Sequence, residues 1–299
     1  MSFSNLPKFV FKYLCSFLDL KSHATFSLIN KKYYGTFFHI RELYTILLQQ
    51  QNSPIKLDES ISQIIKTQTG MDSILHLVCK NKKISIEMIK CLVENKADLN
   101  SKAKFRITPL QLACECEFVS VEIIKCLVED KADLNSKDIS EWAPLHFACK
   151  NQNVSVEKIK YLVENKADLN SKNNAGWTPL HFACQNENIS FEKLKYLVEN
   201  KSNLNEKSKN KKTALHLVCE NKNISIEIIK YLVENKSDLN AKNDSNNTSL
   251  HFACGNDNVS IEMIKYLFEN KADVNIKNKY KIYPLELAQK NGELFQKLK

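Results

Sequence analysis

Glycine, proline and tryptophan are scarce in this sequence of 299 residues, which contains only 5 Gly, 6 Pro and 2 Trp. So few glycines and prolines are atypical of linker-rich or low-complexity proteins. No apolar run approaches the ~18 residues that a membrane-spanning helix needs, so we expect no membrane partner. The apolar segment FVFKYLCSFL is flanked or interrupted by Lys8, Lys12 and Asp19 and precedes no small-residue cleavage site, so we expect no signal peptide.

Apolar residues and cysteines are well represented. Hydrophobic residues make up 43% of the sequence, which is ample for one large core or two moderate ones. The 10 cysteines come without a secretion signal, a combination typical of reduced thiols inside the cell. We therefore expect a cytoplasmic protein, with the nucleus as the alternative.

A period of 35 residues runs through most of the chain. Histidine returns at positions 76, 146, 181, 216 and 251, and Gln111 fills the one missing step. A fixed period between about 20 and 50 residues indicates stacked supersecondary units. One unit, starting at Trp177, reads WTPLHFACQNENISFEKLKYLVENKSNLNEKS.

Each unit predicts two helices. Thr178 is suited to cap the first helix and Pro179 to begin it. Ser190 is suited to cap the second helix, and Glu192 favours its positive N-terminal end. Apolar residues at 191, 194, 197 and 198 predict one buried stripe along that helix.

The sequences TPLHFAC at 178–184 and ADLN at 167–170 resemble the strongest landmarks of ankyrin repeats. The resemblance covers residues 72–299, as six full repeats and a C-terminal half repeat that reads YPLELAQKNGELFQKLK. It implies an all-α fold: an ankyrin-repeat solenoid of helix-turn-helix units with β-hairpin fingers and a concave face that binds other proteins.

Two features depart from this family's pattern. The repeat is longer than the usual ~33 residues, and the extra residues fall between the two helices, around NVS or NIS. Lysine also replaces the glycine that usually follows the second helix, at positions 96, 131, 166, 201, 236 and 271. Either this lysine or the residue before it must take the left-handed conformation, and the sequence does not decide between them.

Each periodic histidine precedes a cysteine by three residues, as in His181 and Cys184, and a helix places such residues on one face. The pair is either a reactive or metal-binding site, or structural. The resemblance implies that the histidine bonds the Thr hydroxyl and nearby backbone while the cysteine fills an alanine-sized position. Zinc needs three or four ligands, and adjacent repeats lie ~8–10 Å apart. We therefore expect structural pairs, no catalytic residue, no metal, no cofactor and no enzymatic activity.

The net charge of +9 raises the question of nucleic acid binding. Three lysine columns of the repeat are matched almost one for one by columns of Glu and Asp, so the repeated frame is nearly neutral. The excess lies at irregular positions such as Lys207, Lys209, Lys211 and Lys212. This cluster is a site for an acidic partner, a weak nuclear signal or a solvated finger tip, and we expect no nucleic acid partner.

Binding positions of a solenoid vary from repeat to repeat, whereas framework positions recur. The variable positions here are the fingers and the residue after each periodic cysteine. Trp142 and Trp177 occupy equivalent positions in adjacent repeats and are candidate hot spots, unless each ring packs over its own hairpin. We predict that a protein target contacts the groove residues Phe105, Arg106, Trp142, Trp177, Lys150 and Gln185.

Residues 1–45 lack the period and resemble an F-box. The resemblance rests on Leu6-Pro7, on Leu14 and Leu18, and on the later stretches LDLKS and SLINKKYY. It implies a small helical module that binds a Skp-type adaptor of a cullin–RING ubiquitin ligase. The positions that would form the adaptor contact and the module core are Leu6, Pro7, Val10, Leu14, Phe17, Leu18, Leu28 and Ile29.

Residues 46–71 predict a helical connector that caps the open end of the repeats. The favoured function is an SCF-type substrate receptor, in which the F-box-like module holds the adaptor and the ankyrin groove holds a target protein. The alternative is an ankyrin scaffold whose N-terminal segment is only a helical cap, with no ubiquitin role. In either case we expect the chain to be monomeric by itself.

Overall fold

The computed structural model describes residues 73–80 and 85–288. These residues divide into two compact units, of which the first holds residues up to 113 together with 118–133, and the second holds 114–117 together with 134–288. The F-box-like module, the connector and the last residues of the half repeat lie outside the described residues.

Short paired helices make up the first unit. Helix α6 (Ile86–Glu94) packs against α5 (Ile74–Cys79) and α8 (Val121–Glu129). A single 3₁₀ turn, η2 (Lys104–Arg106), precedes α7 (Pro109–Glu115), which begins in this unit and ends in the second.

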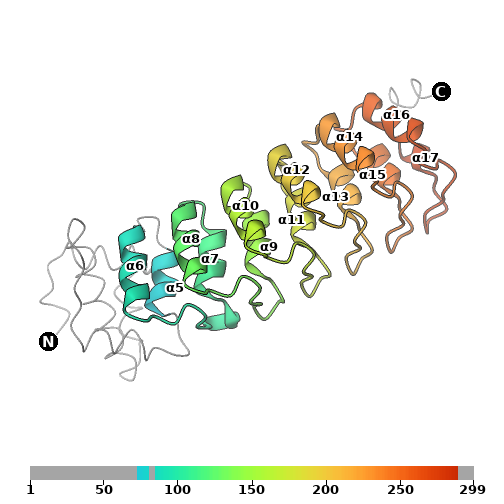
Figure 1. Ribbon diagram of the computed structural model, residues 1–299. Helices are drawn as coiled ribbons and strands as arrows, with labels where there is room; N and C mark the ends of the chain where they lie inside the picture. The colour runs from blue at the N-terminus through green and yellow to red at the C-terminus, as the bar shows by residue number, and fades with distance from the viewer. Residues whose placement is uncertain (1–72, 81–84, 289–299) are drawn as a thin grey trace, which may run out of the picture. The chain divides into compact units, whose positions relative to one another are not determined.

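The second unit is a stack of helix pairs, shown in Figure 1. The pairs are α9 (Pro144–Lys150) and α10 (Val156–Glu164), α11 (Pro179–Gln185) and α12 (Phe191–Glu199), α13 (Ala214–Glu220) and α14 (Ile226–Glu234), and α15 (Ser249–Gly255) and α16 (Ile261–Glu269), followed by α17 (Pro284–Ala288). First helices pack in order, so that α9 contacts α11, α11 contacts α13, α13 contacts α15 and α15 contacts α17. No helix in the described ranges is both long and apolar enough to cross a membrane.

Helix boundaries in the repeat of residues 177–211 follow the predicted caps. Thr178 and Ser190 are the N-caps of α11 and α12, and Ser190 Oγ accepts a hydrogen bond from the Lys193 amide at 3.4 Å. The stripe predicted for α12 is correct at Leu194 and Leu197, which are buried. It is wrong at Phe191, whose side chain is exposed and stacks edge-on against Tyr231 of the next repeat.

From residue 116 on, the extra residues of the repeats form a loop of tight turns between the two helices. In the loop of residues 151–155, Asn151 Oδ1 accepts from the Asn153 amide at 2.9 Å, and Val154 is buried. The Asn151 side-chain amide also donates to the Glu115 carbonyl at 2.7 Å. The insertion therefore adds an apolar plug and a bond between repeats, which offset the entropy of a longer loop.

Lysine, and not the residue before it, takes the left-handed conformation after each second helix. Its φ is between 62° and 74° at Lys96, Lys131, Lys166, Lys201, Lys236 and Lys271. This conformation costs a residue with a side chain roughly 1–2 kcal/mol. Asn135 of the preceding repeat offsets that cost, because its Nδ2 donates to the Lys166 carbonyl at 3.4 Å and its Oδ1 accepts from the Asp168 amide at 2.9 Å.

The fingers that link successive repeats contain no β-strand in any part of the chain that the structure describes, so the expected β-hairpins are corrected to tight turns. From residue 138 on, a buried polar side chain closes each turn: Asn173 Oδ1, for example, accepts from the Ala175 and Trp177 amides, both at 2.9 Å. Neighbouring fingers share one backbone bond, such as the Lys209 amide to the Ala175 carbonyl at 2.9 Å. Within the finger, the Asn173 amide donates to the Trp177 carbonyl at 3.0 Å and the Gly176 amide to the Asn173 carbonyl at 2.8 Å, and these few bonds do not build the alternating ladder that defines a strand.

Candidate interaction surface

Hydrogen bonds hold the periodic histidines at both ring nitrogens. His181 Nδ1 accepts from the Thr178 amide at 3.1 Å and lies 2.8 Å from the Thr178 hydroxyl. Its Nε2 lies 3.1 Å from the Lys212 carbonyl of the next finger. Because Nδ1 accepts a backbone N–H, the ring is neutral and its proton lies on Nε2, which donates to the carbonyl. His216 and His251 repeat the pattern, which confirms the structural role that the resemblance implied.

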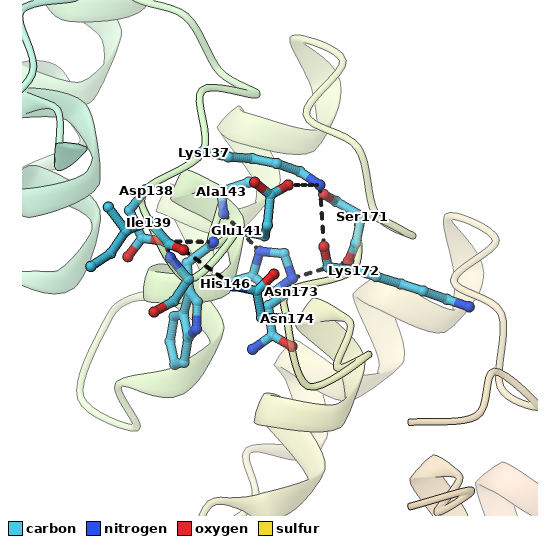
Figure 2. A network of polar contacts seen from close by, with 12 residues as sticks. Lys137, Asp138, Ile139, Glu141, Ala143, His146, Ser171, Lys172, Asn173 and Asn174 are labelled. Atoms are coloured by element: carbon cyan, nitrogen blue, oxygen red, sulfur yellow. Dashed lines mark hydrogen bonds and ion pairs between the residues drawn. The ribbon is translucent and has the colours of Figure 1, made fainter. Parts of the chain in front are cut away.

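The repeat of residues 142–176 carries Ala143 in place of the capping threonine. Figure 2 shows His146 with Nδ1 accepting from the Ala143 amide at 2.9 Å and Nε2 bonded to the Ser171 carbonyl at 3.0 Å. Lys137 crosses the same junction and reaches the Glu141 carboxylate and the Lys172 carbonyl, both at 3.2 Å. We call these two bonds, from Nδ1 to the capping residue and from Nε2 to the next finger, the histidine joint. In this repeat the joint forms without the hydroxyl bond.

Burial leaves the periodic histidines and cysteines without the properties of a reactive pair. It lowers the pKa of His181 and lowers that of His216 to about 4. It raises the pKa of the Cys149 thiol to about 12 and that of Cys184 well above its usual range. A nucleophilic cysteine needs a lowered pKa and an available base, and neither exists here. Within the described ranges no group of three or more His, Cys, Asp and Glu is placed to hold a metal ion.

Four aromatic rings form one patch between the fingers and the first helices of two adjacent repeats. The Trp142 ring centroid lies 5.2 Å from that of Phe147 in its own repeat and 4.3 Å from that of Phe182 in the next. The Trp177 ring lies 5.0 Å from the same Phe182. Both phenylalanines are buried and both tryptophans are half-buried. We call Trp142, Phe147, Trp177 and Phe182 the aromatic patch.

The second unit holds four of the six predicted groove residues, and three of them, Trp142, Trp177 and Lys150, lie at this patch. The Lys150 ammonium lies 5.2 Å from the Trp142 ring centroid, within the range of a cation–π interaction. Trp142 packs beyond its own finger onto α11, so the rings of the two tryptophans are bridged by Phe182. Gln185 is exposed at the end of α11.

The other two predicted groove residues belong to the first unit. Phe105 and Arg106 are both exposed and lie in the turn η2. Both have left-handed backbone conformations, with φ of 64° and 61°. An exposed aromatic ring on a strained turn is a candidate contact in its own right.

Sequence reasoning missed two buried lysines on second helices. The Lys158 ammonium donates to the Cys116 carbonyl at 2.7 Å, and the Lys193 ammonium donates to the Gln152 and Asn151 carbonyls at 2.8 and 3.2 Å. Burial lowers the pKa of both groups. A signal was present, since the equivalent positions elsewhere are all apolar: Met88, Ile123, Ile228 and Met263.

A hollow lies beside Gly255, the residue that follows the last periodic cysteine. Its lining includes Phe252, Asn256 and Leu287. The Lys212 ammonium lies 5.0 Å from the Phe252 ring centroid and forms an ion pair with Glu220 at 2.7 Å. Lys212 occupies the finger position that holds tryptophan in the two preceding repeats, so the polar character of this surface changes along the stack.

The family model of ankyrin repeats matches the chain three times, over residues 46–138, 120–207 and 190–278. Among solved structures, the ankyrin repeat domain of Bcl-3, described as a unique member of the IkappaB protein family, matches with a TM-score of 0.61. That alignment has 23% identity and covers 75% of this chain and 96% of the other, so it supports the fold alone. No protein with a curated description matches.

The matched family consists of binding scaffolds, typically without enzymatic activity, and the comparisons indicate no catalytic family. The repeats therefore have a role in protein–protein interaction. The three matches of the family model together span residues 46–278, which is most of the sequence. The chain belongs to the ankyrin repeat family.

Proposed function

We propose that this chain is the substrate receptor of an SCF-type (cullin–RING) ubiquitin ligase. Residues 1–45 would bind a Skp-type adaptor, and the repeats would hold the target protein. The supporting observation is a division of the sequence: the family match begins at residue 46, and the segment before it follows the separate pattern that opens on Leu6-Pro7. Such a segment gives the chain a second binding function beside that of the repeats.

The target surface of this proposal centres on the aromatic patch. Partly exposed tryptophans backed by buried phenylalanines are rigid anchors of the kind that dominate interface energies. Lys150 adds a polar group at the patch, and Gln185 is exposed at the end of α11. Phe105 and Arg106 are exposed on the first unit and form a separate candidate contact. The tryptophans and phenylalanines contribute area at little entropic cost, because they are already packed against one another.

The mechanism is proximity. The receptor performs no bond chemistry; it holds a target lysine near the charged conjugating enzyme and raises its effective concentration there. This role needs a stiff scaffold, which the bonds between repeats supply. We place the complex in the cytoplasm or the nucleus, where the cysteines stay reduced, and propose that the receptor alone is a monomer.

Adaptor binding tests the ligase part of the proposal. We expect the full chain to bind a purified Skp-type adaptor in isothermal titration calorimetry, and Leu6→Ala/Pro7→Ala to weaken binding at least about tenfold through lost apolar contacts. The matched control is Phe191→Ala, which removes an exposed ring from α12 in the second unit. If the intact chain does not bind, residues 1–45 are only a cap and the chain is an ankyrin scaffold with no ubiquitin role.

Target binding tests the groove. Trp142→Ala/Trp177→Ala should weaken capture of a target protein, identified by pull-down with the full chain, at least about tenfold, as expected when hot-spot rings are lost. Trp142→Phe/Trp177→Phe keeps most of the ring packing and should have a smaller effect. If the affinity of the alanine variant stays within twofold of that of the unchanged chain, the target binds elsewhere.

A further inference from the structure

The last three complete fingers of the second unit carry far more lysine than acid. Their stretches 206–212, 242–247 and 277–282 contain two acidic residues, Glu206 and Asp244, and the lysines 207, 209, 211, 212, 242, 277, 279 and 281. All of these lysines except Lys212 are exposed. The uneven charge is local, because the repeated frame elsewhere is nearly neutral.

Three acids on and beside these fingers already form ion pairs. Glu206 pairs with Lys172 at 2.7 Å, Asp244 with Lys211 at 3.5 Å, and Glu220 with Lys212 at 2.7 Å. Six lysines form no ion pair with any residue that the structure describes: Lys207, Lys209, Lys242, Lys277, Lys279 and Lys281. We call these six the finger lysines. Their like charges repel one another, and an anionic partner would relieve that repulsion.

The backbone under the finger lysines is preorganised. The Lys209 amide donates to Ala175 at 2.9 Å, the Asp244 amide to Asn210 at 3.1 Å and the Lys279 amide to Ser245 at 2.9 Å. These bonds join each finger to the one before it, and Figure 1 shows the fingers projecting in a row from one side of the helix stack. The lysine side chains are flexible, but the row that carries them does not need to assemble when a partner binds.

The row of fingers is continuous with the aromatic patch. Trp142, Trp177 and Lys212 occupy the same position in successive fingers, at the base next to the first helices. Four repeat steps of about 10 Å separate the finger of Trp142 from that of Lys281, which makes about 40 Å. An extended chain of about 12 residues spans that distance.

We infer that this surface binds an extended acidic segment of a partner protein, with an apolar or aromatic residue on the aromatic patch and Asp or Glu residues along the finger lysines. The inference deepens the proposed function, since it names the chemistry of the target, but it does not depend on the adaptor. Nucleic acid fits less well, because Glu206, Asp244 and Glu220 interrupt the row of lysines. A peptide can place neutral residues opposite those acids, whereas a phosphate backbone carries a charge at every step.

Fluorescence anisotropy with the full chain tests this. The probe is a fluorescein-labelled peptide with Phe-Leu at its start followed by alternating Glu and Ser, about 12 residues in all to match the span. Its sequence-reversed form covers the opposite orientation, and a version with Gln for Glu is the neutral control. We expect the better acidic orientation to bind at least about tenfold more tightly than its Gln version and to weaken as salt rises. Equal affinity for the acidic and Gln peptides, or no binding in either orientation, would overturn the inference.

Charge-reversal variants locate the site. Lys209→Glu/Lys279→Glu should lower the affinity for the acidic peptide at least about tenfold, because both lysines lie in the row and neither change breaks an ion pair. The matched control, Lys90→Glu/Lys265→Glu, makes the same change in net charge at exposed positions on α6 and α16. Its affinity for the acidic peptide should stay within twofold of that of the unchanged chain. Equal losses in both variants would mean that only net charge matters, which contradicts a defined site.

Two further measurements separate this inference from its alternatives. A single-stranded RNA of about 12 nucleotides that binds more tightly than the peptide and loses affinity in the same variant would show a nucleic acid surface instead. Adaptor binding by Lys209→Glu/Lys279→Glu should equal that of the unchanged chain. An adaptor that binds while no acidic peptide does would leave the ligase proposal standing and reject the acidic segment, and the reverse result would do the opposite.

Discussion

Repeats 142–211 and 212–281 of the second unit share one framework but present different surfaces. His181 and His216 make the same three contacts, with distances that agree closely between the two. The finger base holds tryptophan in the first pair of repeats, and lysine and asparagine in the second. The comparison shows that the framework is carried by bonds that recur, whereas the binding surface lies where side chains depart from the period.

The surface difference also changes the electrostatics inside the framework. Burial lowers the pKa of both histidines, but nearby Glu206 raises that of His181, whereas Lys212 and Lys207 lower that of His216 further. The two rings have the same hydrogen bonds. The charged finger residues around the two rings therefore differ, although the hydrogen bonds do not.

Removing a histidine should have the largest effect. His181→Ala and His216→Ala should each lower the free energy of unfolding by about 3–5 kcal/mol, because each leaves a buried amide, a hydroxyl and a carbonyl without partners. Since the framework is the same in both halves, the two losses should agree within about 1 kcal/mol, as judged by urea unfolding followed by circular dichroism. A much smaller loss for one of them would show that the halves are not equivalent.

Glutamine provides the conservative control. Gln111 already stands in this column, and its Oε1 accepts from the Thr108 amide at 2.7 Å. His181→Gln and His216→Gln should therefore recover part of the lost stability, because the amide keeps its acceptor. A glutamine variant as unstable as the alanine variant would assign the effect to ring packing instead of hydrogen bonding.

Acid should weaken the lysine-rich half in particular. His216 has a pKa of about 4 when folded against an ordinary value of 6.5, so the unfolded chain takes up its proton first as the pH falls. The stability that neutral His216 contributes is fully present above pH 6.5 and is lost as the pH falls through 4. One proton linked over this interval corresponds to roughly 3 kcal/mol. Urea unfolding between pH 7 and pH 4 should show the loss, and it should be smaller in His216→Gln.

The cause of the low His216 pKa can be tested separately. Lys207→Gln/Lys212→Gln should raise the pKa of His216 in an NMR titration, because two positive charges near the ring are removed. Lys209→Gln is the control, since Lys209 is not among the groups that act on this ring. An unchanged His216 pKa in the double variant would leave burial as the whole explanation.

Some features of this structure can be predicted from the sequence because the residues that form them lie close together in the chain, and others cannot. The helix pairs and the histidine joints were predictable because cap, proline and histidine lie within a few residues of one another. The left-handed lysine was not, because it is defined by the backbone bonds that close the helix, such as the Lys166 amide to the Val163 carbonyl and the Ala167 amide to the Leu162 carbonyl, both at 2.9 Å, and no side chain in the sequence marks them. The aromatic patch was predicted only as two tryptophans, since Phe182 looked like an ordinary framework residue. The F-box-like segment of residues 1–45 remains a prediction.

The second helices of repeats 142–211 and 212–281 also differ, because only the first pair carries buried lysines. Lys158→Met and Lys193→Met should each raise the free energy of unfolding at pH 7 by about 1 kcal/mol, because methionine fills the volume without the desolvation of an ammonium. Met263 provides the precedent in this column. The folded pKa of each lysine is lowered from 10.5, so the buried charge fades as the pH rises and the advantage of methionine should shrink toward that value. Destabilised variants would mean that the carbonyl bonds outweigh desolvation.

The smallest expected effect concerns the one described histidine joint that has an alanine cap. Ala143→Thr should raise the free energy of unfolding by about 0.5–1 kcal/mol, because the new hydroxyl can bond His146 Nδ1 as the Thr178 hydroxyl bonds His181 at 2.8 Å. Thr178→Ala is the reciprocal change and should cost a similar amount, since His181 would keep its amide bond as His146 does. Equal and opposite shifts in urea unfolding would show that the two joints differ by one hydroxyl bond. If Ala143→Thr destabilises the protein, the Trp142 finger packs too closely over this site for a larger residue. Packing at the aromatic patch would then explain why alanine replaces threonine in this repeat.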